Sequence, residues 1–291
     1  MKLSKIIENT KKCKVMNALG NEYLLYDEDC PLCEWYTKQF IRRKLLHSDE
    51  RISFNQATKE KNFELDEERA KNEIALVTQG GEVFYGVDSL LHIFGRRYQW
   101  IERVGSFFPV YGFLKLLYKL ISFNRKVIAP ADCNALNACE PTFNVGWRLA
   151  FILLAGLITN AIVGRFFNTH FALEMRMHFP FLDFSLFVGQ LLFQGLFFRL
   201  FKQGNFLNYA GQIAVISLIG AVLLGAMNLG LSVLYTNGFE IGVLAPAALG
   251  IVLGIMFLEH VRRVRILHHT KWLTVTWLAY RLIIYPIVFV V

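Results

Sequence analysis

The stretch Glu22-Tyr-Leu-Leu-Tyr-Asp-Glu-Asp-Cys-Pro-Leu-Cys33 decides the fold of the N-terminal half of the chain. Its first five residues are mostly apolar or aromatic, which predicts a buried strand at 22–26. The segment 32–46 has the spacing of an amphipathic helix, and Pro31 suits the first turn of that helix. The two cysteines therefore fall at the junction between a strand and a helix.

The residues that follow predict a mixed sheet flanked by helices. A strand is expected at 51–56 and an acidic helix at 65–71. The turn Gln79-Gly-Gly81 separates two further strands, so it predicts a hairpin. The remaining elements expected are strands at 73–78 and 82–85 and helices at 87–96 and 110–123. This order of a strand-helix-strand unit, a hairpin and a helix is a thioredoxin-like α/β pattern.

The Cys30-x-x-Cys33 spacing is the feature that carries chemistry. A helix N-terminus lowers the pKa of a thiol below its usual value of about 8.5. Such a thiolate attacks a disulfide, and a second thiol resolves the mixed disulfide. We therefore expect Cys30 to be the nucleophile and Cys33 the resolving thiol. Asp27 either transfers a proton for Cys33 or caps the loop, and the acidic run 27–29 opposes thiolate formation.

Three blocks of sequence resemble the DCC family of thiol–disulfide oxidoreductases, in the order that the family has them. They are Leu24–Cys33, Gly81–Leu90 and Leu117–Arg125, and the resemblance covers about residues 22–128. It implies a thioredoxin-like domain in which Asp27, Cys30 and Cys33 are the functional positions. The substrate would be a protein or a small-molecule thiol or disulfide, and no cofactor is expected.

The distribution of charge separates this domain from a second one. The chain is 54% hydrophobic and 19% charged, whereas soluble domains average about 25% charged residues. Residues 1–145 hold 21 Lys and Arg against 19 Asp and Glu, and residues 146–291 hold 10 against 4. Most of the net charge of +8 thus lies in the apolar half, so nucleic acid is not an expected partner. The expected parts are a tail (1–20), the thioredoxin-like domain (21–128), a linker (129–145) and a transmembrane helical domain (146–291).

Five apolar stretches are long enough to cross a bilayer as helices. They are Gly146–Gly164, Asp183–Phe201, Leu207–Leu234, Ile241–Leu258 and Trp272–Val291. The third is longer than needed, so we expect it to be tilted or broken near Asn228.

The orientation in the membrane is predicted from the positive charges between the spans. Lys and Arg follow the second span and are concentrated in the expected loop 259–271, whereas the opposite side has only Arg165 and Arg176. This bias predicts a multi-pass protein, of a bacterial cytoplasmic membrane, whose N-terminal domain faces the cytoplasm. No apolar run in residues 1–20 is long enough for a signal peptide.

Arg281 lies midway along the fifth expected span, where a charge costs about 3 kcal/mol. As a functional residue, Arg281 would line a polar pathway or bind a lipid or quinone head group. As a structural residue, it would extend to the membrane interface or pair with Glu259 or Glu240.

Alternative functions remain for the other cysteines and for the apolar half. Cys133 and Cys139 precede the first span and are a candidate second dithiol, or they are incidental linker residues. Together with Cys30 and Cys33 they could instead form a four-thiolate zinc site, although the leading interpretation contains no metal. A third hypothesis makes the apolar half a transporter that the redox domain regulates. A haloacid-dehalogenase phosphatase is disfavoured, because Cys30 stands where that motif needs Thr or Val.

Overall fold

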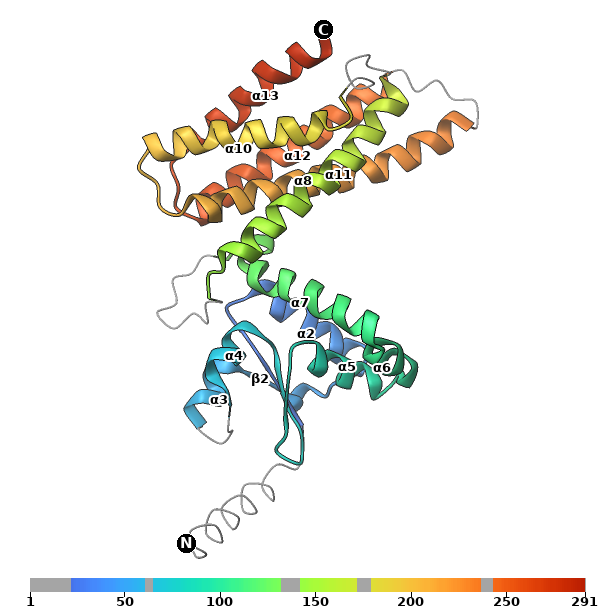
Figure 1. Ribbon diagram of the computed structural model, residues 1–291, viewed down its shortest axis with the longest axis vertical. Coiled ribbons are helices and arrows are strands. Elements are labelled where there is room, and N and C mark those ends of the chain that lie inside the picture. The colour runs from blue at the N-terminus through green and yellow to red at the C-terminus, as the bar shows by residue number, and fades with distance from the viewer. Residues whose placement is uncertain (1–21, 61–64, 132–141, 172–178, 237–242, 291) are drawn as a thin grey trace, which may run out of the picture. The chain divides into compact units, whose positions relative to one another are not determined.

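The computed structural model divides the chain into two compact units, Met1–Asn144 and Val145–Val291. Figure 1 shows the helices and strands of both units. The structure describes residues 22–60, 65–131, 142–171, 179–236 and 243–290.

The N-terminal unit is built on a four-stranded sheet in the order β2-β1-β3-β4. Its strands are β1 (Tyr23–Tyr26), β2 (Arg51–Ser53), β3 (Ala75–Val77) and β4 (Val83–Tyr85). β1 pairs with β2 in parallel and with β3 in antiparallel orientation, and β3 pairs with β4 as the expected hairpin. A parallel pair needs a crossover, which is supplied by helix α2 (Pro31–Arg42) and the short η1 helix (Ser48–Glu50). The thioredoxin-like α/β fold that the sequence predicts is therefore confirmed.

The sheet is covered on both faces because consecutive strand residues point to opposite sides. Leu24 packs with Phe40, Leu76 and Ile93 on the face covered by α2, α5 (Val87–Gly95) and α7 (Phe108–Ile128). Leu25 packs on the other face with Ala57 of α3 (Phe54–Glu60) and with residues of α4 (Glu67–Asn72). The strand end that leads to Cys30 is thus fixed between two apolar layers.

Two expectations about this unit were wrong in detail. The strand expected at 51–56 ends at Ser53, and helix α3 begins directly at Phe54. The backbone amide of Gln56 donates to the Ser53 side chain (3.2 Å), which caps the new helix. Helix α6 (Gln99–Ser106), which precedes α7 and lies at 92° to it, was not predicted from the sequence.

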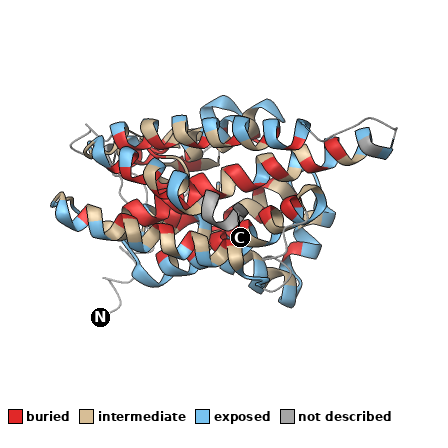
Figure 2. Cartoon of the chain, turned by 90° about the horizontal axis from the view of Figure 1, so that it is seen from above, coloured by how far each residue is buried: buried red, intermediate tan, exposed pale blue. Residues whose placement is uncertain are grey.

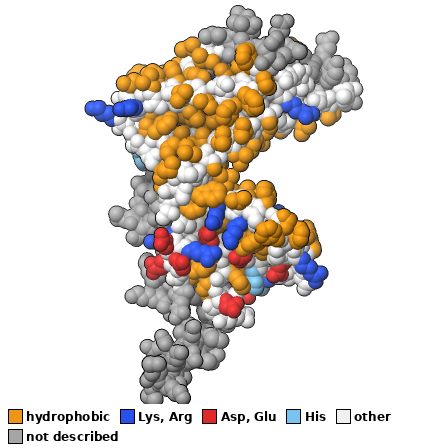
Figure 3. Space-filling view, in the orientation of Figure 1, with side chains coloured by type: hydrophobic (Ala, Val, Ile, Leu, Met, Phe, Trp, Pro, Cys, Tyr) orange, Lys and Arg blue, Asp and Glu red, His pale blue; other side chains and the backbone are white. Residues whose placement is uncertain are grey.

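In its described residues, the C-terminal unit has helices at the five expected places. They are α8 (Val145–His170), α10 (Leu182–Leu200), α11 (Phe206–Thr236), α12 (Leu244–Ile266) and α13 (Trp272–Val290). Among the described residues, three of these helices, α8, α11 and α12, are long and apolar enough to cross a membrane; the bent pair α6–α7 of the N-terminal unit counts as a fourth only if it forms one span. Hydrophobic side chains cover most of the visible face of this unit (Figure 3). These features fit a membrane domain.

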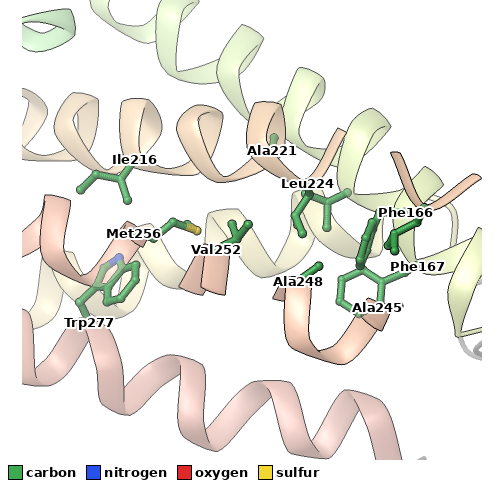
Figure 4. Packing of buried hydrophobic residues seen from close by; sticks show 12 residues of the cluster. Phe166, Phe167, Ile216, Ala221, Leu224, Ala245, Ala248, Val252, Met256 and Trp277 are labelled. Atoms are coloured by element: carbon green, nitrogen blue, oxygen red, sulfur yellow. The ribbon is translucent and has the colours of Figure 1, made fainter. Parts of the chain in front are cut away.

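The core of this unit joins four helices. Figure 4 shows Phe166 and Leu224 at one end of the cluster and Met256 and Trp277 at the other. Small residues allow the helices to approach closely: a Cβ atom on Gly220 would lie within 3.0 Å of the Met256 side chain. Viewed from above, buried and exposed residues alternate along the helices, as expected for helices that pack on one side (Figure 2).

One boundary expectation in this unit was wrong, and another was narrowed. Helix α11 runs unbroken for 31 residues through Asn228, so of the two alternatives expected there only the tilt remains; at about 1.5 Å per residue the helix exceeds the roughly 30 Å of a hydrocarbon core. Most of the loop expected at 259–271 is helical, because α12 continues to Ile266. Its last turns are held by Arg262 and Arg263, which bind the Glu259 carboxylate at 2.6 and 2.7 Å.

Candidate active site

Cys30 and Cys33 lie together at the N-terminus of α2. Cys30 is the N-cap residue, and its sulfur accepts a hydrogen bond from the backbone amide of Cys33 (3.4 Å). Both are free thiols. They are nearly buried, with only 1% of Cys30 and 6% of Cys33 exposed. The helix N-terminus therefore presents its free amide to the first sulfur of the pair.

The two thiols have pKa values displaced in opposite directions. The pKa of Cys30 is lowered to about 7, chiefly because the Cys33 thiol donates a hydrogen bond to it. The pKa of Cys33 is raised, first by that same hydrogen bond and second by burial. A dithiol arranged in this way ionises at Cys30 and keeps its remaining proton on Cys33.

Asp27 lies between the end of β1 and the cysteines and is 8% exposed. One carboxylate oxygen accepts from the backbone amide of Asp29 (3.1 Å), which is the loop cap considered from the sequence. The other accepts from Arg125 Nη2 at 2.8 Å. Burial nevertheless raises the pKa of Asp27, and Arg125 opposes that shift. A carboxyl whose pKa is raised can accept a proton near neutral pH more readily than an exposed one.

Arg125 is a further residue of this site and was not among those predicted from the sequence. It comes from the far end of α7 and is 5% exposed. Its guanidinium also donates to the carbonyl oxygens of Lys71 (3.0 Å) and Asn72 (3.4 Å), where α4 ends. The available signal was its position as the last residue of the third block that resembles the DCC family. Arg125 lowers the pKa of Cys30, which offsets the opposing effect of Asp27.

A mainly apolar cavity of about 340 Å³ adjoins Cys33. Aromatic and aliphatic side chains from α2, α5 and α7 make most of its wall, among them Phe40, Phe94 and Tyr118. Tyr118 also holds α7 to the sheet, because its hydroxyl accepts from the backbone amide of Ile74 (2.8 Å). The polar part of the wall includes Asp27 and Arg125.

The other candidate residues do not join this site within the described part of the chain. Cys133 and Cys139 fall in 132–141, outside the described residues. No group of three or more His, Cys, Asp or Glu side chains suited to a metal ion occurs among the residues that the structure describes. Arg281 lies over the ring of Trp277 (4.7 Å to its centre) and lines a cavity of about 40 Å³ with Asp183 and Gln190.

Comparison with known proteins supports the N-terminal assignment. Searches of curated proteins and of solved structures found no match. A family model does match. It covers the sheet, the cysteine pair and α7, and it ends at residue 129, directly after α7. The resemblance drawn from the three sequence blocks is therefore confirmed: residues 24–129 match the DCC1-like thiol-disulfide oxidoreductase family.

Proposed function

We propose that this protein is a membrane-anchored thiol–disulfide oxidoreductase whose N-terminal domain faces the cytoplasm. The observation that carries the redox role is the pair of adjacent sulfurs at the start of α2, one with a lowered and one with a raised pKa. The family match to residues 24–129 supports the same class of reaction.

The proposed reaction begins at Cys30. Its thiolate attacks one sulfur of a substrate disulfide, so a Cys30–substrate disulfide forms and the other substrate sulfur leaves as a thiolate that takes up a proton. Cys33 then loses its proton to Asp27 and attacks the Cys30 sulfur. The second substrate sulfur leaves as a thiolate and takes up a proton in its turn. The domain ends with a Cys30–Cys33 disulfide, and the substrate has gained two electrons as two thiols.

Trapping tests these roles. In the Cys33→Ser variant of the full chain, the mixed disulfide has no resolving thiol and should accumulate, visible as an added mass on the peptide that holds Cys30. Cys30→Ser should trap nothing, and Cys13→Ser is the matched control that keeps the pair intact. Trapping at an equal level in Cys30→Ser would refute the assignment of the nucleophile.

The cytoplasmic orientation rests on the positions of positive charge. Arg199 lies in the last turn of α10, and Arg263 and Arg265 lie in the last turn of α12. The proposal takes α8, α10, α11 and α12 as successive membrane crossings, as expected from the sequence. The C-terminal ends of α10 and α12 then lie on the side of the N-terminal domain, and Lys and Arg favour the cytoplasmic side. The test is labelling of Cys13 with a membrane-impermeant maleimide. Intact cells should protect Cys13, and inverted vesicles should expose it; the reverse result would overturn the orientation.

A further inference from the structure

The burial of both sulfurs limits what this dithiol can react with. Cys30 is 1% exposed and Cys33 is 6% exposed. A disulfide on the surface of a folded protein cannot approach sulfurs that are covered to this extent. The cavity of about 340 Å³ has Cys33, the hydrogen-bond partner of Cys30, in its wall, so it is the space next to the pair in which the body of a substrate can lie.

The wall of this cavity selects by polarity. Its charged side chains are already paired: Asp27 with Arg125 at 2.8 Å, and Glu73 with Arg69 at 3.2 Å. The rest is mostly apolar, with Phe40, Phe54 and Phe94 among the lining residues. An ionic group brought into this space would lose water without gaining an opposite charge, which is costly. An apolar group would gain from burial.

The size of the cavity suits a body of one or two rings. An apolar cavity of about 150 Å³ is enough to hold benzene, and this one has more than twice that volume at about 340 Å³. Pockets for small organic ligands start at about 300 Å³.

The rim of the cavity is apolar as well. Trp35 and Ile121 line it and are themselves 61% and 41% exposed, so they mark its opening. Ile121 continues a stripe on α7 with Phe113 and Leu117, spaced four residues apart and exposed to solvent. Hydrophobic side chains gather on the visible side of this unit in Figure 3. An exposed apolar surface that leads to a cavity is typical of a route for an apolar ligand.

We propose that the substrate of the Cys30–Cys33 pair is a small, uncharged, mainly apolar disulfide whose body occupies the cavity beside Cys33. This inference rests on the proposed function, because it names the substrate class of the same dithiol. Each turnover oxidises the dithiol to the Cys30–Cys33 disulfide and reduces the substrate disulfide to two uncharged thiols, with the proton transfers given above.

Two aromatic disulfides that differ in charge test the proposal on the full chain. Bis(4-nitrophenyl) disulfide is uncharged, and 5,5′-dithiobis(2-nitrobenzoate) adds one carboxylate to each ring of that compound. Leu90→Trp fills the cavity from α5, since Leu90 is one of its lining residues. Leu116→Trp is the matched control, because Leu116 is exposed on α7 and is not part of the wall. Comparing the two variants in the same detergent cancels the partition of each compound into micelles.

The expected result is a loss of preference in Leu90→Trp alone. The rate with the uncharged disulfide, divided by the rate with the charged one, should fall by about tenfold relative to Leu116→Trp, the effect of excluding an apolar group from a pocket. An equal ratio in the two variants would overturn the cavity proposal while leaving the redox function intact. Exchange with neither disulfide in the wild type would instead overturn the proposed function itself.

A second measurement does not depend on any variant. Bis(4-nitrophenyl) sulfide has the shape of the uncharged substrate but no disulfide bond, so it can bind and cannot be reduced. It should slow the exchange of the wild-type pair with 5,5′-dithiobis(2-nitrobenzoate) in a competitive manner. Its carboxylated analogue, tested in parallel, should inhibit about tenfold more weakly. Equal inhibition by the two sulfides, or none by either, would contradict an apolar site beside Cys33.

Discussion

Replacing Arg125 with Met should destabilise the N-terminal unit in a pH-dependent way. Arg125 and Asp27 are 5% and 8% exposed, and their charged atoms lie 2.8 Å apart. Removing one partner of a buried ion pair costs about 3–5 kcal/mol, because the other charge stays buried. Since burial already raises the pKa of Asp27, its carboxyl can avoid part of this cost by taking up a proton. We therefore expect a loss of about 3 kcal/mol at pH 8, the lower end of that range.

The sign of the pH dependence follows from the direction of the shift. In Arg125→Met the pKa of Asp27 rises further above its value in the unfolded chain. The folded state then binds more protons than the unfolded state between those two pKa values. Stability therefore falls as the pH rises through that window and stays low above it. The destabilisation should be largest at pH 8 and smaller at pH 4.

The assay is the urea concentration at which Cys30 and Cys33 become accessible to 4,4′-dithiodipyridine, a disulfide reagent that modifies thiols at pH 4 as well as at pH 8, read by mass spectrometry of the full chain. Each variant is compared with the wild type at the same pH. Lys119→Met, on the same helix, removes a positive charge that is not part of the site and should change stability by less than about 0.5 kcal/mol. Asp27→Asn combined with Arg125→Met should recover part of the loss. A loss of the same size at pH 4 and pH 8 would refute the role of the buried carboxylate.

Three further predictions concern single positions. The alkylation rate of Cys30 by iodoacetamide should rise with pH around a midpoint near 7 and shift to higher pH in Arg125→Met; an unshifted midpoint would mean that Arg125 does not act on this thiol. Gly86→Ala should destabilise the N-terminal unit by at least about 1 kcal/mol, because Gly86 has a φ of +61° and a Cβ atom there would lie 2.9 Å from the Glu73 carboxylate. The control in the same urea titration is Gly112→Ala, since a Cβ atom on Gly112 meets nothing within 4 Å. Gln194→Leu should reduce the stability of the C-terminal unit by about 0.6 kcal/mol and so lower its melting temperature in detergent. The reason is that the Gln194 side chain accepts hydrogen bonds from Tyr209 (3.1 Å) and Thr276 (3.2 Å) on two other helices. An unchanged melting temperature would show that these bonds add no net stability.

Features set by neighbouring residues could be predicted from the sequence. The strand at 22–26, the helix after Pro31 and the hairpin at 79–81 each depend on a short pattern, and the structure has all three. The cysteine pair follows from them, because its place at the strand-helix junction is a local property.

Features set by distant contacts could not be predicted in the same way. Asp27 and Arg125 are 98 residues apart, and no local pattern indicates that they pair. Asn228 marked the place where the over-long third span was expected to tilt or break. The helix does not break there, and the Asn228 side chain binds His170 of α8 at 2.9 Å, so a contact between helices satisfies the polar group. Helix α6 was not predicted because its eight residues are fewer than the roughly 11–18 over which a helical period can be recognised.

The long sequence separation between Asp27 and Arg125 also sets an order of events during synthesis. The strand, the cysteines and the first helix leave the ribosome well before α7, so the buried carboxylate has no cationic partner until residue 125 emerges. Only 16 residues lie between the end of α7 at Ile128 and the start of α8 at Val145. Completion of the thiol centre and delivery of the first long apolar helix therefore fall in the same short interval of translation. A chain that stalls before this interval holds two cysteines in an unfinished domain, a state in which thiols are prone to wrong pairing.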